Sequence, residues 1–287
     1  MNEPTVSTPP RTLPPAPGFL TSSLRIFDLS LGEMLWSRRT VFMLLIVGAP
    51  VLIALFIRVL VSLGAPVLDG PANVRMTGPA IFGMMVWIFY LRFTIPVLGV
   101  FYGTSLIADE IEDKTVTYLF TRPIRRGAVL VGKYFAYLAC TVFVVLPSVM
   151  LVYLLIVPLQ GTLGGSFMDL LKDLSLLALG LGVYGALFAF IGAKFKRPLL
   201  IGLIFIFGWE QAALAFPGYL KYYTVAYYLQ ALVPHAMPRD GALSMIQGIF
   251  RETPGLAASL FALFLIWLVF LTLAGWVVER KEYVLEQ

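Results

Sequence analysis

The stretch DEIEDKTVTYLFTRPIRR, at residues 109–126, lies between two long apolar runs at residues 80–107 and 129–157. It holds eight charged residues in a chain of which only 13% is charged. Each flanking run exceeds the roughly 20 residues that a helix needs to cross the hydrocarbon core of a bilayer. The sequence therefore predicts a charged segment that lies in water between two membrane-spanning helices.

The composition of the whole chain supports the same class of protein. Hydrophobic residues make up 59% of the 287 residues, and the mean hydropathy is +0.88. Solid apolar blocks exclude a soluble core, and they also exclude a membrane β-barrel, whose strands alternate between apolar and polar residues. We predict an all-α polytopic membrane protein, a single transmembrane domain over residues 24–287. Its six transmembrane helices are expected at residues 40–63, 80–107, 129–157, 170–193, 198–216 and 255–278.

The N-terminal part of the chain is predicted to hold a tail and a short helix. Residues 1–23 are expected to be a disordered tail, because six prolines fall within the first 18 residues and almost nothing there is apolar. After the tail, apolar residues recur three or four positions apart at Leu24, Phe27, Leu31 and Leu35. This spacing is typical of an amphipathic helix in the membrane interface. A simple extension of the first span is the alternative.

The distribution of Lys and Arg predicts the orientation, since cytoplasmic loops are enriched in both. With the N-terminus inside, 14 of the 21 basic residues fall on the cytoplasmic side and 5 on the opposite side, while Arg58 and Arg92 lie within spans. Both termini and residues 109–126 are therefore expected in the cytoplasm. The basic residues form no clustered face, so we expect no nucleic-acid partner.

The charged segment itself has the pattern of a helix. Its start is acidic, Arg122 lies near its end, and Pro123 stops it, so the charges complement the helix dipole. The acidic residues at the start are Asp109, Glu110, Glu112 and Asp113. Such a helix could bind a partner through its acidic face, or it could be an ordinary solvated helix.

The longer string ADEIEDKTVTYLFTRPIRRGAVLVGKYFA, residues 108–136, resembles the stretch after the second span in export permeases of the type-2 ATP-binding-cassette (ABC) class. The matching positions are Asp109, Glu110, Glu112, Thr115, Leu119, Pro123, Arg125, Arg126, Gly132 and Lys133. Lys114 departs from the pattern, which often has Gly there. The interfacial helix, the six spans and the long loop before the last span are also similar to this class.

The resemblance implies a mechanism for the chain. In such permeases the cytoplasmic helix docks as a coupling helix into a groove on a separate ABC ATPase subunit, which binds ATP and Mg and moves the attached spans. The resemblance also implies a second permease copy, the same or different, and substrate export across a plasma membrane, here a bacterial inner membrane. This chain would then bind no cofactor and would not itself be an enzyme.

Two other kinds of site are excluded by the residues. GAVLVGKY, at residues 127–134, matches a phosphate-binding loop except at Tyr134, where a Ser or Thr must bind Mg²⁺. The chain has one histidine, His235, and one cysteine, Cys140, which excludes His- or Cys-rich metal clusters. Nucleotide binding and metal catalysis are therefore not expected from this chain.

Charged residues within the spans are the remaining candidates for chemistry. Arg92 and Glu210 each lie about 12 residues into a span, so both are about 18 Å deep at 1.5 Å per residue. A buried charge in lipid is costly unless it is paired or hydrated, so the two could form a pair, or each could extend separately to an interface. Arg58 is expected to reach the outer interface. If no ATPase exists, Arg92 and Glu210 could serve an ATP-independent carrier or channel.

Two further features have more than one interpretation. Small residues recur in the fourth span at Ala178, Gly182 and Ala186, which permits close helix packing either within the chain or against a second copy. The Tyr-rich loop at residues 217–254 is expected to form a short helix near residues 222–233, in or at the outer leaflet. An ordinary external loop is the alternative.

Overall fold

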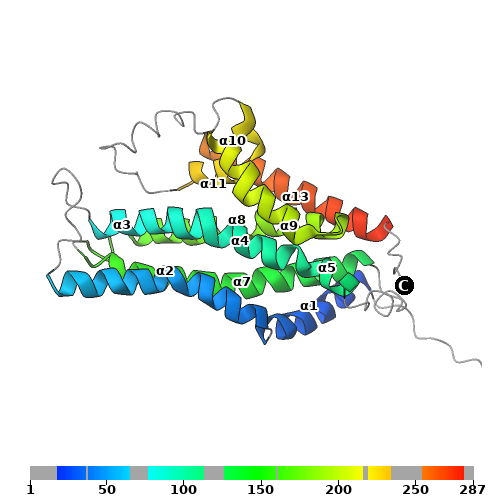
Figure 1. Cartoon of the computed structure of the whole chain (residues 1–287), viewed down its shortest axis with the longest axis horizontal. Coiled ribbons are helices and arrows are strands. Elements are labelled where there is room, and N and C mark those ends of the chain that lie inside the picture. Colours follow the sequence, from blue (N-terminus) through cyan, green and yellow to red (C-terminus); the bar gives the residue numbers. More distant parts are fainter. Residues whose placement is uncertain are drawn as a thin grey trace, which may run out of the picture.

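The computed structural model describes residues 18–36, 38–64, 77–112, 126–159, 161–215, 219–233 and 254–280. Residues 1–17 of the predicted tail, the segment 113–125 and the site of His235 lie outside these ranges. All the regular elements in the described part are helical, and they form an elongated bundle (Figure 1). This confirms the predicted all-α class.

The order of the helices along the chain is as follows. The first half of the chain contains α1 (Phe19–Leu35), α2 (Arg38–Ser62), α3 (Gly78–Met85), η2 (Val86–Thr94), α4 (Ile95–Leu98), η3 (Gly99–Gly103), α5 (Ser105–Glu112) and α7 (Arg126–Ile156). The second half contains α8 (Phe167–Lys194), α9 (Pro198–Ile204), η4 (Phe205–Glu210), α10 (Gln211–Ala215), η5 (Tyr219–Tyr223), α11 (Val225–Ala231) and α13 (Leu256–Arg280).

Five helices in the described part are long and apolar enough to cross a membrane. They are Thr40–Ser62, Gly78–Ala108, Gly127–Ile156, Phe167–Lys194 and Leu256–Arg280. Each agrees with a predicted span within three residues at either end. The span predicted at 198–216 corresponds to a shorter apolar helix, Pro198–Ala213. It is short because Pro198 begins it directly after the turn from α8, and α10 ends at Ala215.

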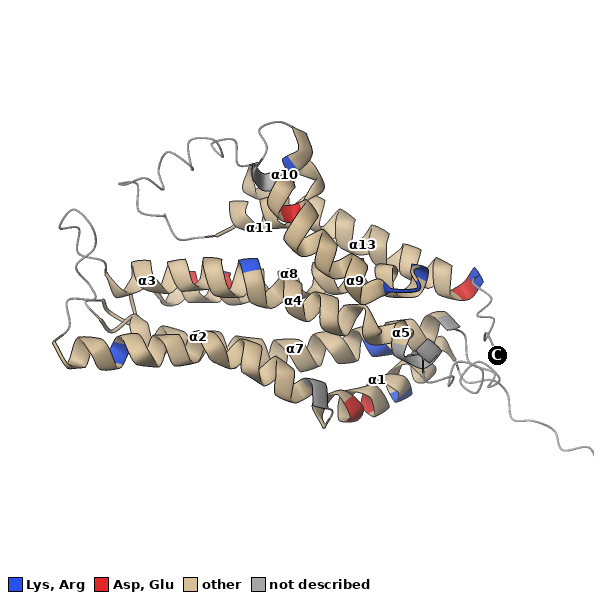
Figure 2. Ribbon diagram, in the orientation of Figure 1, with Lys and Arg blue, Asp and Glu red and all other residues tan. Residues whose placement is uncertain are grey.

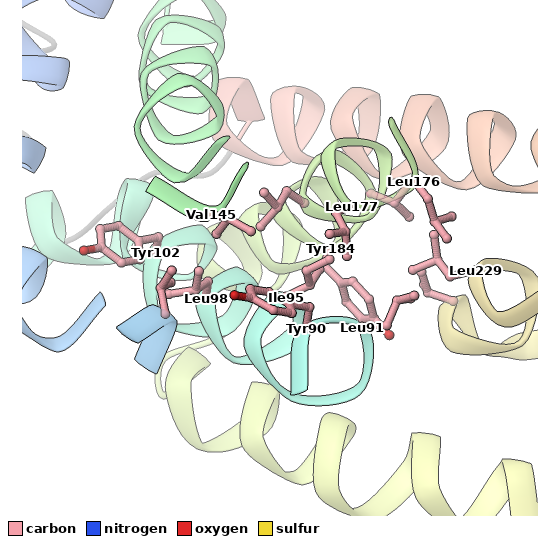
Figure 3. Packing of buried hydrophobic residues seen from close by; sticks show 14 of the residues in the cluster. Tyr90, Leu91, Ile95, Leu98, Tyr102, Val145, Leu176, Leu177, Tyr184 and Leu229 are labelled. Carbon is pink, nitrogen blue, oxygen red and sulfur yellow. The ribbon is translucent and has the colours of Figure 1, made fainter. Parts of the chain in front are cut away.

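Helix α8 forms the centre of the bundle. In its most apolar stretch 72% of the residues are buried, against 11% in α13. A Cβ atom on Gly185 would lie 2.2 Å from the Tyr137 ring of α7, and one on Gly192 would lie 2.3 Å from the carbonyl oxygen of Thr104. The small residues of α8 therefore pack against helices of the same chain. Figure 3 shows Leu176, Leu177 and Tyr184 of this helix within the hydrophobic core.

The second span is continuous but not a regular α-helix. Two π-helical segments, η2 and η3, interrupt it on either side of the short helix α4. Pro96 lies in the first turn of α4, where its missing N–H removes one helical hydrogen bond. Helices α7 and α8, in contrast, are α-helical from Arg126 to Ile156 and from Phe167 to Lys194. π-helical turns occur frequently at functional sites.

One end of the bundle joins the second and third spans directly. The N–H of Gly78, at the start of α3, donates to the carbonyl oxygen of Leu159 just beyond α7, at 2.8 Å. A Cβ on Gly78 would lie 2.4 Å from that oxygen and from the carbonyl oxygen of Ile156. Only glycine therefore permits this contact. At the opposite end of the bundle, α5 and α7 are connected through residues 113–125.

Helix α1 begins earlier than expected and packs against α7. It starts at Phe19, although the tail is predicted to extend to residue 23. It contacts α7 through small residues, and the Ser23 hydroxyl donates to the carbonyl oxygen of Ala128 at 3.2 Å. A Cβ on Gly132 would lie 2.6 Å from the carbonyl oxygen of Ser23, so the two backbones approach closely. Burial of this first turn against α7 explains why the helix starts before residue 24.

The face of α1 that is buried against the protein consists mainly of small residues. The buried residues are Ser22, Ser23, Ile26 and Ser30. Leu24 and Leu29 are exposed, and so is Trp36 beyond the helix end. A small face allows the close contact with α7, whereas the larger leucine side chains would hold the two helices apart.

Candidate functional site

Arg92 and Glu210, the two charges predicted to lie about 18 Å deep, are both in π-helical segments. Arg92 belongs to η2, and Glu210 is the last residue of η4. Glu210 is buried, with only 2% of its surface exposed, whereas Arg92 is half-buried. Figure 2 shows charged residues gathered mainly at the end of the bundle that holds α1, α5 and the end of α13, with few along its length.

The carboxylate of Glu210 is held by neutral donors from two other helices. The hydroxyl of Tyr184 in α8 donates to it, at 2.7 Å from one oxygen and 2.9 Å from the other. The backbone N–H groups of Val225 and Ala226, in the first turn of α11, also donate to it. Glu210 thus joins its own helix to α8 and α11. These donors provide the compensation that a carboxylate needs when it is buried.

The guanidinium of Arg92 bonds to a different residue. It donates to the side-chain oxygen of Gln211, the first residue of α10, and it lies 5.7 Å from the centre of the Trp87 ring. Arg92 and Glu210 are both described, and no ion pair joins them within 4.0 Å. Because Gln211 follows Glu210, the structure brings the two predicted charges into one polar cluster without pairing them directly.

Sequence reasoning missed three members of this cluster. Tyr184 has no distinctive signal, because tyrosine is common in apolar spans. Gln211 could have been found in the sequence, because it is a polar residue next to Glu210 in an apolar segment, where a polar side chain needs a hydrogen-bond partner. The N–H groups of α11 could not have been found, because no side chain marks them.

Arg58 lies apart from this cluster. It is half-buried in α2, and its guanidinium donates to the carbonyl oxygen of Leu155, near the end of α7, at 3.4 Å. The carbonyl groups of a last helical turn lack partners within the helix, so Arg58 satisfies one of them. Its expected extension to an interface stays a prediction.

The residues predicted for coupling are only partly described. Residues 109–112, which include Asp109, Glu110 and Glu112, extend the helix of the second span as the end of α5, and do not begin a separate helix. The reason is that residues 105–112 contain no Gly or Pro to interrupt it. Arg126 begins α7. The other predicted residues lie outside the described ranges: Asp113, Thr115, Leu119, Pro123 and Arg125.

Comparison with protein-family models matches residues 32–283 to the model described as ABC-2 family transporter protein. The chain belongs to the ABC-2 family. It is therefore a membrane component of an ABC-type transporter, and the family implies association with an ABC ATPase partner. A comparison with curated proteins gave no match.

In this ABC-2 chain the tyrosine that breaks the phosphate-loop pattern has a packing role. Tyr134 is fully buried, its hydroxyl donates to the carbonyl oxygen of Gly182 at 2.7 Å, and it accepts from the indole N–H of Trp267 at 2.6 Å. One turn further along α7, the Tyr137 hydroxyl donates to the carbonyl oxygen of Leu181 at 3.0 Å. These hydrogen bonds join α7 to α8 and α13.

The described residues of this ABC-2 chain contain no cluster of metal ligands. No set of three or more His, Cys, Asp or Glu side chains there could hold a metal ion. Cys140 is buried in α7. The polar cluster around Glu210 is therefore the part of the described membrane bundle with the most distinctive chemistry.

Proposed function

We propose that the chain is the permease subunit of an ABC exporter and provides the translocation pathway. ATP and Mg bind to a separate ATPase subunit, where the ATP is hydrolysed. The family match over residues 32–283 carries this proposal. The bundle of long apolar helices and the charged stretch between the second and third spans support it.

The membrane topology that we propose has six spans. The helix from α9 through α10 is the short fifth span, and both termini are in the cytoplasm of a bacterial cell, beneath its inner membrane. The excess of Lys and Arg on that side supports this orientation. Helix α1 lies in the cytoplasmic interface, where its exposed Leu24, Leu29 and Trp36 contact lipid.

The coupling segment transmits the movement of the ATPase to the spans. Residues 109–126 dock on the ATPase, and α5 and α7 emerge from the two ends of this segment. Helix α7 is joined to α8 and α13 by the hydrogen bonds of Tyr134 and Tyr137. A displacement of the start of α7 is therefore passed to three spans together. Two permease chains and two ATPase chains form the working transporter.

A charge reversal at Glu112 and Asp113, each changed to Lys, tests this proposal. An ABC ATPase subunit from the same organism is co-expressed with the chain, and its recovery with the purified permease is measured. We expect the recovery to fall about tenfold, which corresponds to about 1.4 kcal/mol of binding free energy. The reason is that two acidic side chains are lost from the docking segment.

The matched control is Asp169→Lys, a partly exposed acid that pairs with Lys172 at the start of α8, at the opposite end of the bundle. It should leave recovery of the ATPase unchanged. Full recovery and full ATP-driven transport with the reversed Glu112 and Asp113 would refute the coupling role. Transport by the chain without any ATPase, driven by an ion gradient, would refute the proposed function itself.

A further inference from the structure

Helix α11 is a short element that packs into the bundle. It has seven residues and contacts η2, α8 and α13. Its Leu229 is fully buried and lies close to Ile95 and Gly180, since a Cβ on Gly180 would lie 3.3 Å from both side chains. In Figure 3 Leu229 faces Leu176 across this contact. The helix therefore covers the part of the second span that carries Arg92.

The first turn of α11 lacks a cap from its own segment. Thr224 precedes the helix in an extended conformation, but its hydroxyl donates back to the carbonyl oxygen of Lys221 at 2.7 Å and makes no capping hydrogen bond. The first N–H groups of a helix have no partner within the helix. Here the N–H groups of Val225 and Ala226 donate to the carboxylate of Glu210, from another helix.

This contact is buried, so water does not compete for the hydrogen bonds that Glu210 accepts. Tyr184 donates to both oxygens of the same carboxylate and fixes its position relative to α8. Loss of Glu210 would leave buried N–H groups at the start of α11 and a buried hydroxyl on α8 without their acceptor.

We propose that Glu210 is the positioning residue that docks α11 onto the bundle, and that α11 leaves as a unit when this carboxylate is lost. Docked α11 shields η2 and its polar cluster. Undocked α11 opens that region from the side of the bundle on which η5 and α10 lie. The inference goes beyond the proposed function, because it concerns contacts within this chain and does not depend on an ATPase.

A cysteine at Ala226 reports the docked state. Ala226→Cys is a small change at a position that is 9% exposed and lies in the contact itself. The native Cys140 is replaced by Ala, so that the reporter is the single thiol in the chain. The purified protein in detergent is reacted with a maleimide, and the rate of labelling is measured. Local opening controls the reactivity of such a buried group.

When Glu210 is present, we expect the maleimide to label Ala226→Cys slowly. With Glu210→Ala the labelling should be at least about tenfold faster, the factor that corresponds to a change of about 1.4 kcal/mol in the opening equilibrium. Glu210→Gln retains the size of the side chain but adds N–H donors that face the donors of α11, so it should also accelerate labelling. Tyr184→Phe should have a smaller effect, because the N–H groups of α11 keep their acceptor.

Two controls separate undocking from general unfolding. Glu33→Gln removes an exposed carboxylate on α1 and should leave labelling of Ala226→Cys slow. A second reporter, Ala186→Cys in the buried centre of α8, should stay unreactive in the Glu210 variants. If Glu210→Ala does not yield folded protein, the labelling rate of Glu210→Gln is the test of the proposal. Slow labelling of Ala226→Cys in a folded Glu210 variant, or equal acceleration of both reporters, would overturn the proposal.

Discussion

The unit formed by α7, α8 and α13 differs in construction from the region formed by η2, η4 and α10. The first consists of unbroken α-helices joined by hydrogen bonds from neutral side chains to backbone carbonyl groups, as at Tyr134 and Tyr137. The second contains π-helical turns and holds the charged side chains of Arg92 and Glu210. Arg92 and Glu210 thus both lie where the helices of the bundle are irregular.

This difference shows how the chain accommodates charge within apolar surroundings. The irregular helices place each charge against a neutral partner, Gln211 for Arg92 and Tyr184 for Glu210. The regular helices instead approach closely at glycine, as at Gly185 and Gly192. The stability of the first unit should therefore depend most on side-chain volume. The stability of the second should depend most on its hydrogen bonds.

The largest effect is expected from added volume in the regular unit. Gly185→Ala places a Cβ where the Tyr137 ring lies, at 2.2 Å. We expect a loss of about 3 kcal/mol or more, at the upper end of overpacking costs. Thermal unfolding in detergent measures it. Gly275→Ala in α13 is the matched control, because nothing lies within 4 Å of its added Cβ, and it should leave stability equal or slightly higher. Equal unfolding temperatures for the two variants would contradict the close α7–α8 contact.

An intermediate effect is expected from loss of a hydrogen bond in the irregular region. Gln211→Leu removes the acceptor of the Arg92 guanidinium while it nearly preserves volume. We expect a loss of about 1.5–3 kcal/mol, the range for hydrogen bonds to charged groups. The same thermal measurement applies. Gln230→Leu, at a half-buried glutamine of α11, should have a smaller effect. A stable Gln211→Leu variant would show that Arg92 has another partner.

The smallest effect is expected from the hydroxyl groups of the regular unit. Tyr134→Phe removes the bond to Gly182 and the acceptor for Trp267 but retains the ring. We expect a loss of about 0.6–1 kcal/mol, since side-chain hydrogen bonds between membrane helices contribute little on average. Tyr219→Phe, at a tyrosine that is 83% exposed, should change nothing measurable. If Tyr134→Phe costs more than Gly185→Ala, the ranking of volume over hydrogen bonding in this unit is wrong.

The sequence predicts the spans well because their hydropathy depends on single residues and not on partners. The expected limits of the second span differ from Gly78–Ala108 by only two residues at the start and one at the end. Its π-helical segments could not be predicted, because a shift in backbone hydrogen bonding leaves the apolar pattern almost unchanged. Pro96 indicates an irregularity there but not its form.

The candidate site could be predicted only in part, for a related reason. Arg92 and Glu210 stand out against apolar neighbours, so their importance is visible in the sequence. Their partners depend on which helices lie side by side, and two of the three donors to Glu210 come from the backbone of α11. The face of α1 shows the same limit, because the small residues that contact α7 carry no hydrophobic signal.

The contact between Gly78 and Leu159 gives the second and third spans a shared pivot. Because their backbones touch at that end, the two helices cannot separate there without the loss of a hydrogen bond and of close packing. Their other ends have a chain of 13 residues between them, at positions 113–125. A force applied to that connection therefore acts with the leverage of the full helix length, and small displacements near the pivot accompany large ones at the far end.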